Sequence, residues 1–324
     1  MIKVGIVGYG NLGRGVCLAV TKAKDLECVG IFTRRDPSSI NPVVNYPVYS
    51  MAELDNFKGN VDVLILCGGS ATDLPSNTAN ILKDFNTVDS FDNHGKIPEY
   101  YSKLEKVAKE SGTLSAISIG WDPGMFSIAR MLFGAVLPDG NDYTFWGKGV
   151  SQGHSDAIRR ITGVKNAIQY TIPKDEALER VRSGENPELS ARDKHLRECY
   201  VAVEEGADKA KIENEIKTMP NYFEPYDTIV NFVSEEEVKK MQQKLSHGGF
   251  VIRSGKTTEE NSEILELSLK LESNPEFTGS VLTAYARAVA RLSKEGKSGV
   301  VTVFDVPLKY LSPESEEELR AHLL

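Results

Sequence analysis

The chain has 324 residues and a mass of 35.7 kDa, more than one hydrophobic core usually organises, so two domains are expected. Hydrophobic residues make up 40% and charged residues 26% of it, an ordinary globular composition that excludes a disordered or fibrous protein. The formal net charge of −8 argues against binding nucleic acid or an anionic membrane surface, and favours a small-molecule substrate.

The first 120 residues alternate short apolar strands with helices. Strands are predicted over residues 2–7, 28–32, 61–67, 87–91 and 113–119, and helices over residues 14–24, 77–85 and 98–111. Parallel strands need crossover connections, and these helices supply them on both faces of a sheet. We therefore predict an α/β fold in which residues 1–120 form a doubly wound parallel sheet of the Rossmann type.

The pattern changes after Trp121. A helix is predicted over residues 125–135 and strands near residues 143–147, 169–172, 199–203, 228–233 and 250–253, and leucines that alternate with polar residues predict a half-buried strand over 265–271. A long helix is predicted over residues 277–294. Residues 121–295 are therefore expected to form a second, α+β domain with a mostly antiparallel or mixed sheet. A strand at 300–306 and a helix from Pro313 are expected to complete the first domain with residues 296–324.

Cysteine and histidine spacing indicates neither disulfides nor a metal site. The four cysteines form no CxxC pair and no signal segment precedes Ile2, so a cytoplasmic protein with reduced thiols is expected. The five histidines lack zinc-ligand spacing, and no metal is expected. No apolar run approaches the ~18 residues of a membrane span, so no membrane association is expected.

A glycine motif follows the first predicted strand. Residues 8–13, GYGNLG, match GxGxxG between a strand and a helix, the context in which a helix N-terminus faces a dinucleotide pyrophosphate. The alternative is a glycine-rich turn without a ligand. The motif predicts cofactor contacts from Gly8, Tyr9, Gly10, Asn11 and Leu12.

The end of the second strand indicates which dinucleotide is bound. NAD sites usually place an acidic residue there for the ribose hydroxyls, whereas this sequence has Thr33, Arg34 and Arg35. Guanidinium groups bind a 2′-phosphate through charged hydrogen bonds, so NADP is the predicted cofactor. The alternative is that one arginine is merely solvated, with Asp36 partly offsetting the pair.

Three further strand ends lie at the predicted ligand-binding edge of the sheet. The segment Cys67, Gly68, Gly69 and Ser70 is a candidate second cofactor loop, although a helix cap at Thr72 or Asp73 explains the same residue types. Asp92 follows the predicted strand at 87–91, and Asp122 follows the one at 113–119. Two acids at this edge suit a cationic group, although Asp122 before Pro123 could equally be a turn or cap residue. The candidate cofactor contacts at these two ends are Ser90, Phe91, Asp92, Gly120, Trp121, Asp122 and Pro123.

Eleven short segments together resemble a known enzyme family. In chain order they are VGYGNLG, TRR, GSATD, DNH, GWDPGMF, TFWG, SQGHSDA, QYT, TMPNYF, HGG and NPEFT, and they span essentially the whole chain. They closely resemble the meso-diaminopimelate D-dehydrogenases, NADP-dependent amino-acid dehydrogenases of bacterial lysine and cell-wall metabolism. The resemblance implies reversible oxidative deamination of the D centre of meso-2,6-diaminopimelate to L-2-amino-6-oxopimelate (tetrahydrodipicolinate) and ammonia. It also implies a homodimer whose second domain, residues 121–295, serves substrate binding and dimerisation.

The resemblance also assigns roles to residues. It implies that Asp92 and Asp122 hold the ammonium of the D centre and are the catalytic residues. The other implied substrate contacts are Trp146, Gln152 and Gly153 in the pocket, Thr171, Arg197 and His247 on the distal carboxylate, and Asn274 at the distal end. Around residues 247–274 the sequence departs from the family pattern by about one residue. By themselves, Asn274 and Pro275 fit a helix start, and Arg197 fits an exposed strand edge.

No histidine or lysine stands out as the proton acceptor, so water relayed by Asp92 or Asp122 is the hypothesis for that step. Because a fold does not determine a substrate, two alternative functions remain. One is another two-domain NADP-dependent imine or carbonyl reductase of amino-acid biosynthesis. The other is a non-catalytic NADP sensor.

Overall fold

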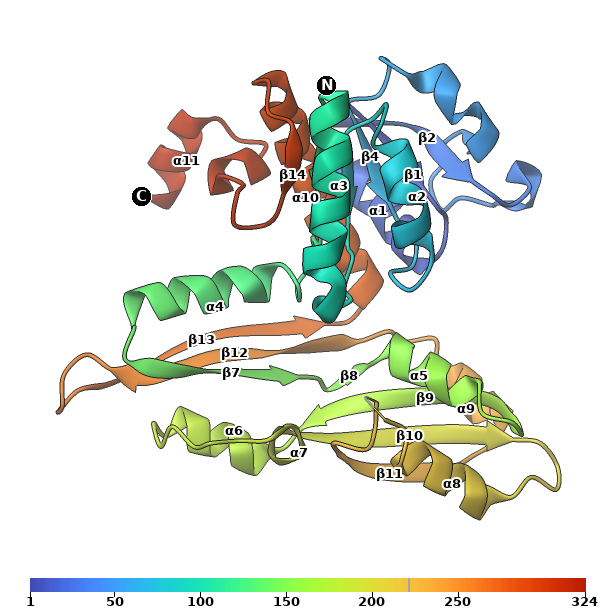
Figure 1. The fold of residues 1–324 in the computed structure, drawn as a ribbon, viewed down its shortest axis with the longest axis vertical. Helices are drawn as coiled ribbons and strands as arrows, with labels where there is room; N and C mark the ends of the chain where they lie inside the picture. The colour runs from blue at the N-terminus through green and yellow to red at the C-terminus, as the bar shows by residue number, and fades with distance from the viewer. Residues whose placement is uncertain (221) are drawn as a thin grey trace. The chain divides into compact units, whose positions relative to one another are not determined.

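The computed structural model describes residues 1–220 and 222–324, so Asn221 of the TMPNYF segment lies outside the described residues. The chain divides into two compact units (Figure 1). Unit 1 comprises Met1–Ile128 and Pro275–Leu324, and unit 2 comprises Ala129–Asn274.

Unit 1 is built on a parallel sheet, which confirms the predicted fold class. Its described residues form seven strands in the order β14-β6-β5-β4-β1-β2-β3, and every neighbouring pair is parallel. The strands are β1 Ile2–Val7, β2 Leu26–Thr33, β3 Val48–Ser50, β4 Val63–Leu66, β5 Thr87–Asp89, β6 Leu114–Ala116 and β14 Gly299–Val301. The expected return of the chain near residue 300 is confirmed, since β14 pairs with β6. The three-residue strand β3 is too short to give a periodic signal and was not predicted.

Helices bury both faces of this sheet because its strands are apolar on both sides. On β4, Val63 and Ile65 pack into one core cluster, and Leu64 and Leu66 pack into the other. Residues of α1 and α10 belong to the first cluster, and residues of α2 and α3 to the second. The helices are α1 Asn11–Lys22, α2 Asp73–Ile81, α3 Ile97–Ser111, α10 Asn274–Lys294 and α11 Glu316–Leu323, with short 3-10 helices η1 Pro37–Ser39, η2 Met51–Phe57, η3 His94–Lys96 and η4 Leu308–Leu311.

Helix α10 packs with unit 1, whereas the sequence placed residues 275–295 in the second domain. Its buried residues Leu282, Tyr285 and Val289 share a core cluster with Val4 and Ile6 of β1. Gly279 approaches α1 so closely that an added Cβ would lie 2.6 Å from the Gly15 carbonyl carbon. The boundary therefore follows this packing, which the helical periodicity alone does not reveal.

The described residues of unit 2 form two sheets rather than the single sheet expected. Their described orders are β11-β10-β9-β8 and β13-β12-β7, and β10 and β11 form a parallel pair among otherwise antiparallel neighbours. The strands are β7 Gly140–Trp146, β8 Gly149–Val150, β9 Val164–Pro173, β10 His195–Val203, β11 Asp227–Phe232, β12 His247–Lys256 and β13 Ser262–Leu271. Between β7 of the three-stranded sheet and β8 of the four-stranded sheet, the chain passes through Gly147, whose φ of 110° is open to glycine but strained for other residues. This break separates β7 from β8 and so divides the sheets.

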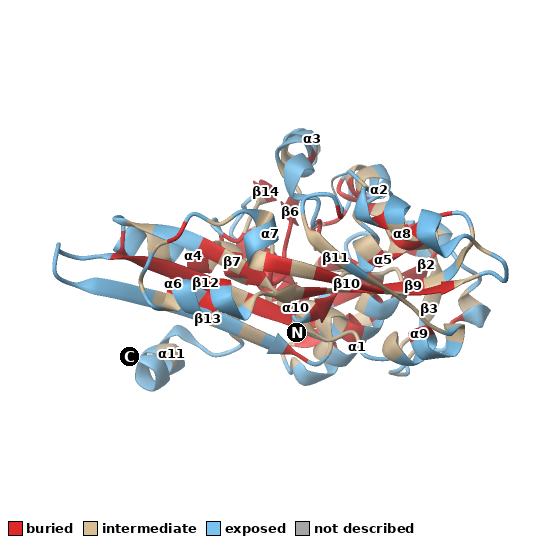
Figure 2. Cartoon of the chain, turned by 90° about the horizontal axis from the view of Figure 1, so that it is seen from below, coloured by how far each residue is buried: buried red, intermediate tan, exposed pale blue. Residues whose placement is uncertain are grey.

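Helices flank these sheets, namely α5 Gln152–Arg159, α6 Asp175–Arg182, α7 Ala191–Lys194, α8 Lys209–Lys217 and α9 Glu235–Met241, while α4 Met125–Val136 leads in from unit 1. The half-buried strand predicted at 265–271 is confirmed, because its leucines are less exposed than the residues between them, and β13 appears mostly exposed in Figure 2. Among the described residues, no helix combines the length and apolarity needed to cross a bilayer.

Candidate functional site

The glycine loop between β1 and α1 has the geometry of a dinucleotide-binding turn. Gly8 has a φ of 94°, and a Cβ on Gly13 would lie 2.3 Å from the Gly8 carbonyl oxygen, so the backbone itself requires both glycines. A Cβ on Gly10, by contrast, would meet no atom within 4 Å. No side chain caps the N-terminus of α1 at Gly10. The open space and the uncapped helix end suit an approaching pyrophosphate.

The two arginines after β2 have different surroundings. The Arg35 guanidinium donates to the Tyr9 carbonyl oxygen, and the Arg35 backbone N–H donates to the Thr33 hydroxyl at 3.1 Å. Arg34 pairs with Asp73 at 2.5 Å, and the Arg34 side chain is 67% exposed. The Arg35 guanidinium therefore lies against the glycine loop, and the Arg34 guanidinium lies beside the loop after β4.

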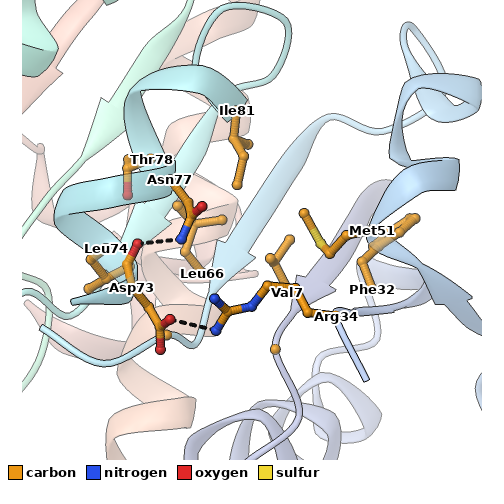
Figure 3. A pocket seen from close by; sticks show the side chains of 12 residues that line it. Val7, Phe32, Arg34, Met51, Leu66, Asp73, Leu74, Asn77, Thr78 and Ile81 are labelled. Carbon is orange, nitrogen blue, oxygen red and sulfur yellow. Dashed lines mark hydrogen bonds and ion pairs between the residues drawn. The ribbon is translucent and has the colours of Figure 1, made fainter. Parts of the chain in front are cut away.

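An apolar pocket adjoins this ion pair (Figure 3). Its apolar wall consists of Val7, Phe32, Met51, Leu66, Leu74 and Ile81. Arg34 and Asp73 also line the pocket, and Figure 3 shows their side chains pointing toward each other. An apolar slot beside a cationic group at the end of β2 fits the adenine and 2′-phosphate of NADP.

The loop from Cys67 to Asp73 is organised by a carboxylate rather than by a helix cap. Thr72 occupies the N-cap position of α2 but makes no side-chain cap bond. Asp73, the first helical residue, accepts a hydrogen bond from the Gly69 N–H at 3.2 Å. The Ser70 hydroxyl accepts from the Asp92 N–H at 3.1 Å, so this loop directly contacts the segment after β5.

Asp122 lies in a tight turn after β6. The peptide before Pro123 is cis, and Trp121 and Gly124 form an isolated bridge. Gly124 has a φ of 136°, and a Cβ there would lie 1.7 Å from the Gly120 carbonyl oxygen. Asp122 is partly buried, whereas Asp92 is exposed. The turn explains the backbone at Asp122, and a role for its carboxylate is compatible with it.

Arg197 is a buried cation in unit 2. It is 5% exposed on the inner strand β10, so its interpretation as an exposed strand-edge charge is wrong. Its guanidinium donates to the Thr171 hydroxyl and lies 4.0 Å from the centre of the Tyr226 ring. Among the described residues no carboxylate forms an ion pair with it, and its Nε has no hydrogen-bond partner. Because an uncompensated buried charge is costly, this arrangement favours an anionic ligand.

Neutral imidazoles surround Arg197. His195 is 1% exposed, its Nε2 accepts from the Trp146 backbone N–H at 2.9 Å, and burial, with Arg197 nearby, lowers its pKa to about 3. The two rings stack with centroids 5.3 Å apart. Burial likewise lowers the pKa of His247, whose Nδ1 accepts from the Gly248 N–H at 2.8 Å, and that of His154 to about 4. Because burial keeps these three imidazoles neutral near pH 7, the positive charge at this place resides on Arg197.

The other predicted substrate residues have simpler settings. Gln152 and Gly153 are exposed at the start of α5, next to Ser151, whose hydroxyl is 2.7 Å from the His154 Nδ1. Asn274 is the first residue of α10, in line with a helix start there, and its N–H donates to the Leu245 carbonyl oxygen at 2.8 Å.

Three residues around these sites were not predicted. Tyr226 and His195 surround the guanidinium, and Asp89 lies buried beneath the segments that carry the two candidate acids. The sequence offered little signal for Tyr226 or Asp89. His195 is close to Arg197 along the chain, but its packing against Trp146 joins strands of two different sheets, β10 and β7, and has no local sequence signal.

The chain is similar to proteins of one enzyme family over its full length. The family model of the diaminopimelic acid dehydrogenase C-terminal domain matches residues 120–273. The meso-diaminopimelate D-dehydrogenase of Ureibacillus thermosphaericus is 60% identical over 323 residues, covering 100% of this chain and 99% of that protein. That of Corynebacterium glutamicum is 45% identical over 320 residues, covering 99% and 98%.

Solved structures agree with this similarity. A multiply substituted meso-diaminopimelate dehydrogenase of Clostridium tetani with diaminopimelate is 54% identical, with a TM-score of 0.96 and all of both chains covered. The C. glutamicum enzyme in complex with diaminopimelate is 44% identical, with a TM-score of 0.93, covering 100% of this chain and 99% of that one. An engineered D-amino acid dehydrogenase bound to NADP+ is 42% identical, with a TM-score of 0.89 and the same coverage.

Proposed function

Because the chain belongs to the meso-diaminopimelate D-dehydrogenase family, we propose that it deaminates the D centre of meso-2,6-diaminopimelate oxidatively and reversibly, with NADP as cofactor. The products are L-2-amino-6-oxopimelate, the open form of tetrahydrodipicolinate, and ammonia. The structural observation that carries this proposal is the buried Arg197, a cation without a carboxylate partner among the described residues, which suits one carboxylate of a diacid.

The cofactor proposal rests on the residues around the glycine loop. The uncapped start of α1 and the open space at Gly10 suit the pyrophosphate, and the apolar pocket suits the adenine. Arg34 and Arg35 provide the charge for the 2′-phosphate. When bound, NADP+ supplies the acceptor for the hydride that leaves the substrate carbon. The remaining proposed contacts are Cys67, Gly68, Gly69 and Ser70 and the strand ends at 90–92 and 120–123.

Asp92 and Asp122 act on the reacting nitrogen in this proposal. Loss of hydride from the D carbon leaves a cationic iminium, which water then hydrolyses to the oxo acid and ammonia. Two carboxylates hold the ammonium beforehand and stabilise the cation as it forms, which is electrostatic catalysis by preorganised charge. Water hydrogen-bonded to either carboxylate takes the amine proton.

Unit 2 supplies recognition of the unreactive end of the substrate. Arg197 and Thr171 bind the carboxylate of the L centre through charged and neutral hydrogen bonds. Neutral His247 offers a further hydrogen-bonding group, and Trp146 offers an apolar ring for the carbon chain. Gln152, Gly153 and Asn274 complete the proposed contacts. Binding energy from this end aligns the reacting carbon.

We also propose that the enzyme is a cytoplasmic homodimer. Helix α4 exposes Met131, Leu132 and Val136 by 50%, 49% and 60%, and β13 exposes Ile264 by 38%, which gives unit 2 apolar side chains that a second copy could cover. The four cysteines are free thiols, as suits a reducing compartment.

One assay tests the function. We expect NADPH formation at alkaline pH with meso-diaminopimelate and little with the LL or DD isomers. Activity on simple aldehydes or imines without activity on the diamino diacid would instead identify a different reductase. Tight NADP binding with no turnover of any of these compounds would identify a sensor. Either result would contradict the proposal.

A further inference from the structure

Asp89 is a buried carboxylate that no proposed step uses. It ends β5, is 0% exposed, and accepts hydrogen bonds from three segments. The Phe91 N–H donates to its Oδ1 at 2.9 Å, the Ser118 N–H donates to the same oxygen at 3.3 Å, and the Tyr100 hydroxyl donates to its Oδ2 at 2.8 Å. One side chain thus joins the loop after β5, the segment after β6 and helix α3.

Two of these segments carry the proposed catalytic acids. Asp92 directly follows Phe91, and Asp122 stands four residues after Ser118. The backbone adds a further link, because the Ile119 N–H donates to the Asp89 carbonyl oxygen at 2.9 Å. Asp89 is therefore bonded, through both its side chain and its main chain, to the segments that lead to both acids.

The segment after β6 needs such an anchor at Ser118. Ser118 has a φ of 58°, a left-handed conformation that is unfavourable for a residue with a Cβ. Strained backbone of this kind persists where surrounding contacts over-determine it. The hydrogen bond from the Ser118 N–H to Asp89 is one such contact, and it sets the direction in which the chain enters the turn at 120–124.

The packing around Asp89 makes it a rigid attachment point. The Tyr100 ring stacks on Phe91 with centroids 4.2 Å apart, and the Tyr100 hydroxyl also lies 2.8 Å from the Thr78 hydroxyl. Burial raises the pKa of Asp89 to about 6, while the hydrogen bonds from Phe91, Tyr100 and Ser118 oppose that rise. At the alkaline pH of the assay the group is ionised and accepts from all three donors.

We propose that Asp89 is a positioning residue that holds Asp92 and Asp122 in register for the reacting amine. This inference rests on the proposed function, in which those two carboxylates bind the ammonium. Asp89 itself touches neither substrate nor cofactor in this proposal. It acts through the backbone of the two segments that it joins.

The test compares Asp89→Asn with Thr87→Val. Asparagine has a similar shape but turns an NH2 group toward at least one of the three donors. Thr87→Val is the matched control, because it removes a buried 2.8 Å hydrogen bond to Ser115 between the same strands, β5 and β6, without touching either loop. We expect Asp89→Asn to lower kcat with meso-diaminopimelate at least tenfold at pH 9 with NADP affinity changed less than threefold, and Thr87→Val to change kcat less than twofold.

A second measurement does not depend on activity. Hydrogen exchange followed by mass spectrometry should show faster exchange in residues 90–94 and 117–122 of Asp89→Asn, and wild-type exchange there in Thr87→Val. If Asp89→Asn does not fold, Asp89→Ser replaces it, since serine presents no N–H to the backbone donors.

The outcomes separate this inference from the proposed function. A wild-type protein that does not deaminate diaminopimelate refutes the function, and hydrogen exchange still decides whether Asp89 holds the two loops. An active wild type with equal kcat in Asp89→Asn and Thr87→Val overturns the inference and makes Asp89 a purely structural residue. Unchanged exchange in both loops overturns it as well.

Discussion

Arg197 and Thr171 are directly opposite each other on β10 and β9, and the buried guanidinium donates a hydrogen bond to the threonine hydroxyl. This bond and the Tyr226 ring satisfy only part of a group that has five N–H donors. Burial also lowers the pKa of Arg197, which expresses the cost of holding its charge away from water. A bound carboxylate would offset that cost by pairing with the guanidinium.

The first prediction follows from this pair. Arg197→Met should raise KM for meso-diaminopimelate by about 10- to 100-fold, since a hydrogen bond to a charged group contributes roughly 1.5–3 kcal/mol. NADP affinity should stay at its wild-type value. Thermal stability should not fall, because the change replaces an uncompensated buried charge with an apolar chain. Arg192→Met, at an exposed arginine of α7, is the control. An unchanged KM in Arg197→Met would refute the carboxylate clamp.

The second prediction concerns cofactor choice. Replacing Arg34 and Arg35 together by serine should weaken NADP binding by about 3 kcal/mol or more, because each charged hydrogen bond to the 2′-phosphate contributes roughly 1.5–3 kcal/mol. NAD binding should hardly change, since NAD lacks that phosphate. Titration of both cofactors by calorimetry measures the difference. Equal losses of binding free energy for the two cofactors would show that the arginines do not bind the 2′-phosphate.

Asp73 gives the opposite prediction at the same site. In this structure its carboxylate pairs with Arg34, so it competes with the 2′-phosphate for that cation. Asp73→Asn should tighten NADP binding by a factor of about two to five, a small effect because exposed ion pairs contribute only ~0.2–1 kcal/mol. NAD should be unaffected, and the ratio of the two dissociation constants is the readout. A weaker NADP complex would mean that Asp73 mainly supports the loop through Gly69.

The nucleotide half of the fold was predictable because its signals are local. Strand β1, the glycines at 8 and 13 and the arginines after β2 lie within one stretch of sequence, and each glycine has a backbone reason visible in the turn. The site around Arg197 is different in kind. Arg197 and Thr171 are 26 residues apart and meet only through the register of β9 and β10, which hydrophobic periodicity does not specify. Without the family resemblance, an arginine between Leu196 and Glu198 has the sequence context of an edge strand.

Asp89 shows a second limit of sequence reasoning. Asp89 and Asp92 are both acids near the end of the same strand. From the sequence, only Asp92, which the structure shows to be exposed, was interpreted as a ligand for a cation. The buried one is distinguished by donors from Tyr100 and Ser118, which lie 11 and 29 residues away along the chain. Helix packing and a left-handed residue created that environment, and neither has a local signature.

The fourth prediction is a pH dependence of stability to which His195 contributes. Its folded pKa of about 3 lies below the usual value of 6.5, so between these values the unfolded chain binds a proton that the native protein does not. Stability is therefore complete above about pH 6.5 and is lost as the pH falls toward 3, by ~1.4 kcal/mol per unit. His195→Gln, which keeps an acceptor for the Trp146 backbone N–H, should reduce this slope in denaturant titrations, and the part that remains comes from His154 and His247, whose pKa values are also lowered. His322→Gln, at an exposed position, should not, and an equal slope in all three proteins would remove His195 as the cause.

The last prediction concerns charge at the proposed reacting nitrogen, and Asp122→Asn isolates it because the two side chains have nearly the same shape. Asparagine and aspartate also have similar preferences for turns, so a purely structural Asp122 before Pro123 would tolerate the change with little loss of activity. If the carboxylate stabilises the ammonium and the developing iminium, kcat should fall on the order of 100-fold or more, as with other losses of preorganised charge. NADP affinity and Tm should stay near wild type. Asp92→Asn should behave alike, and the double variant should lose less than the product of the single losses, because both groups act on one charge. Near-normal turnover in Asp122→Asn would refute a catalytic role for the Asp122 carboxylate and would make it a turn residue only.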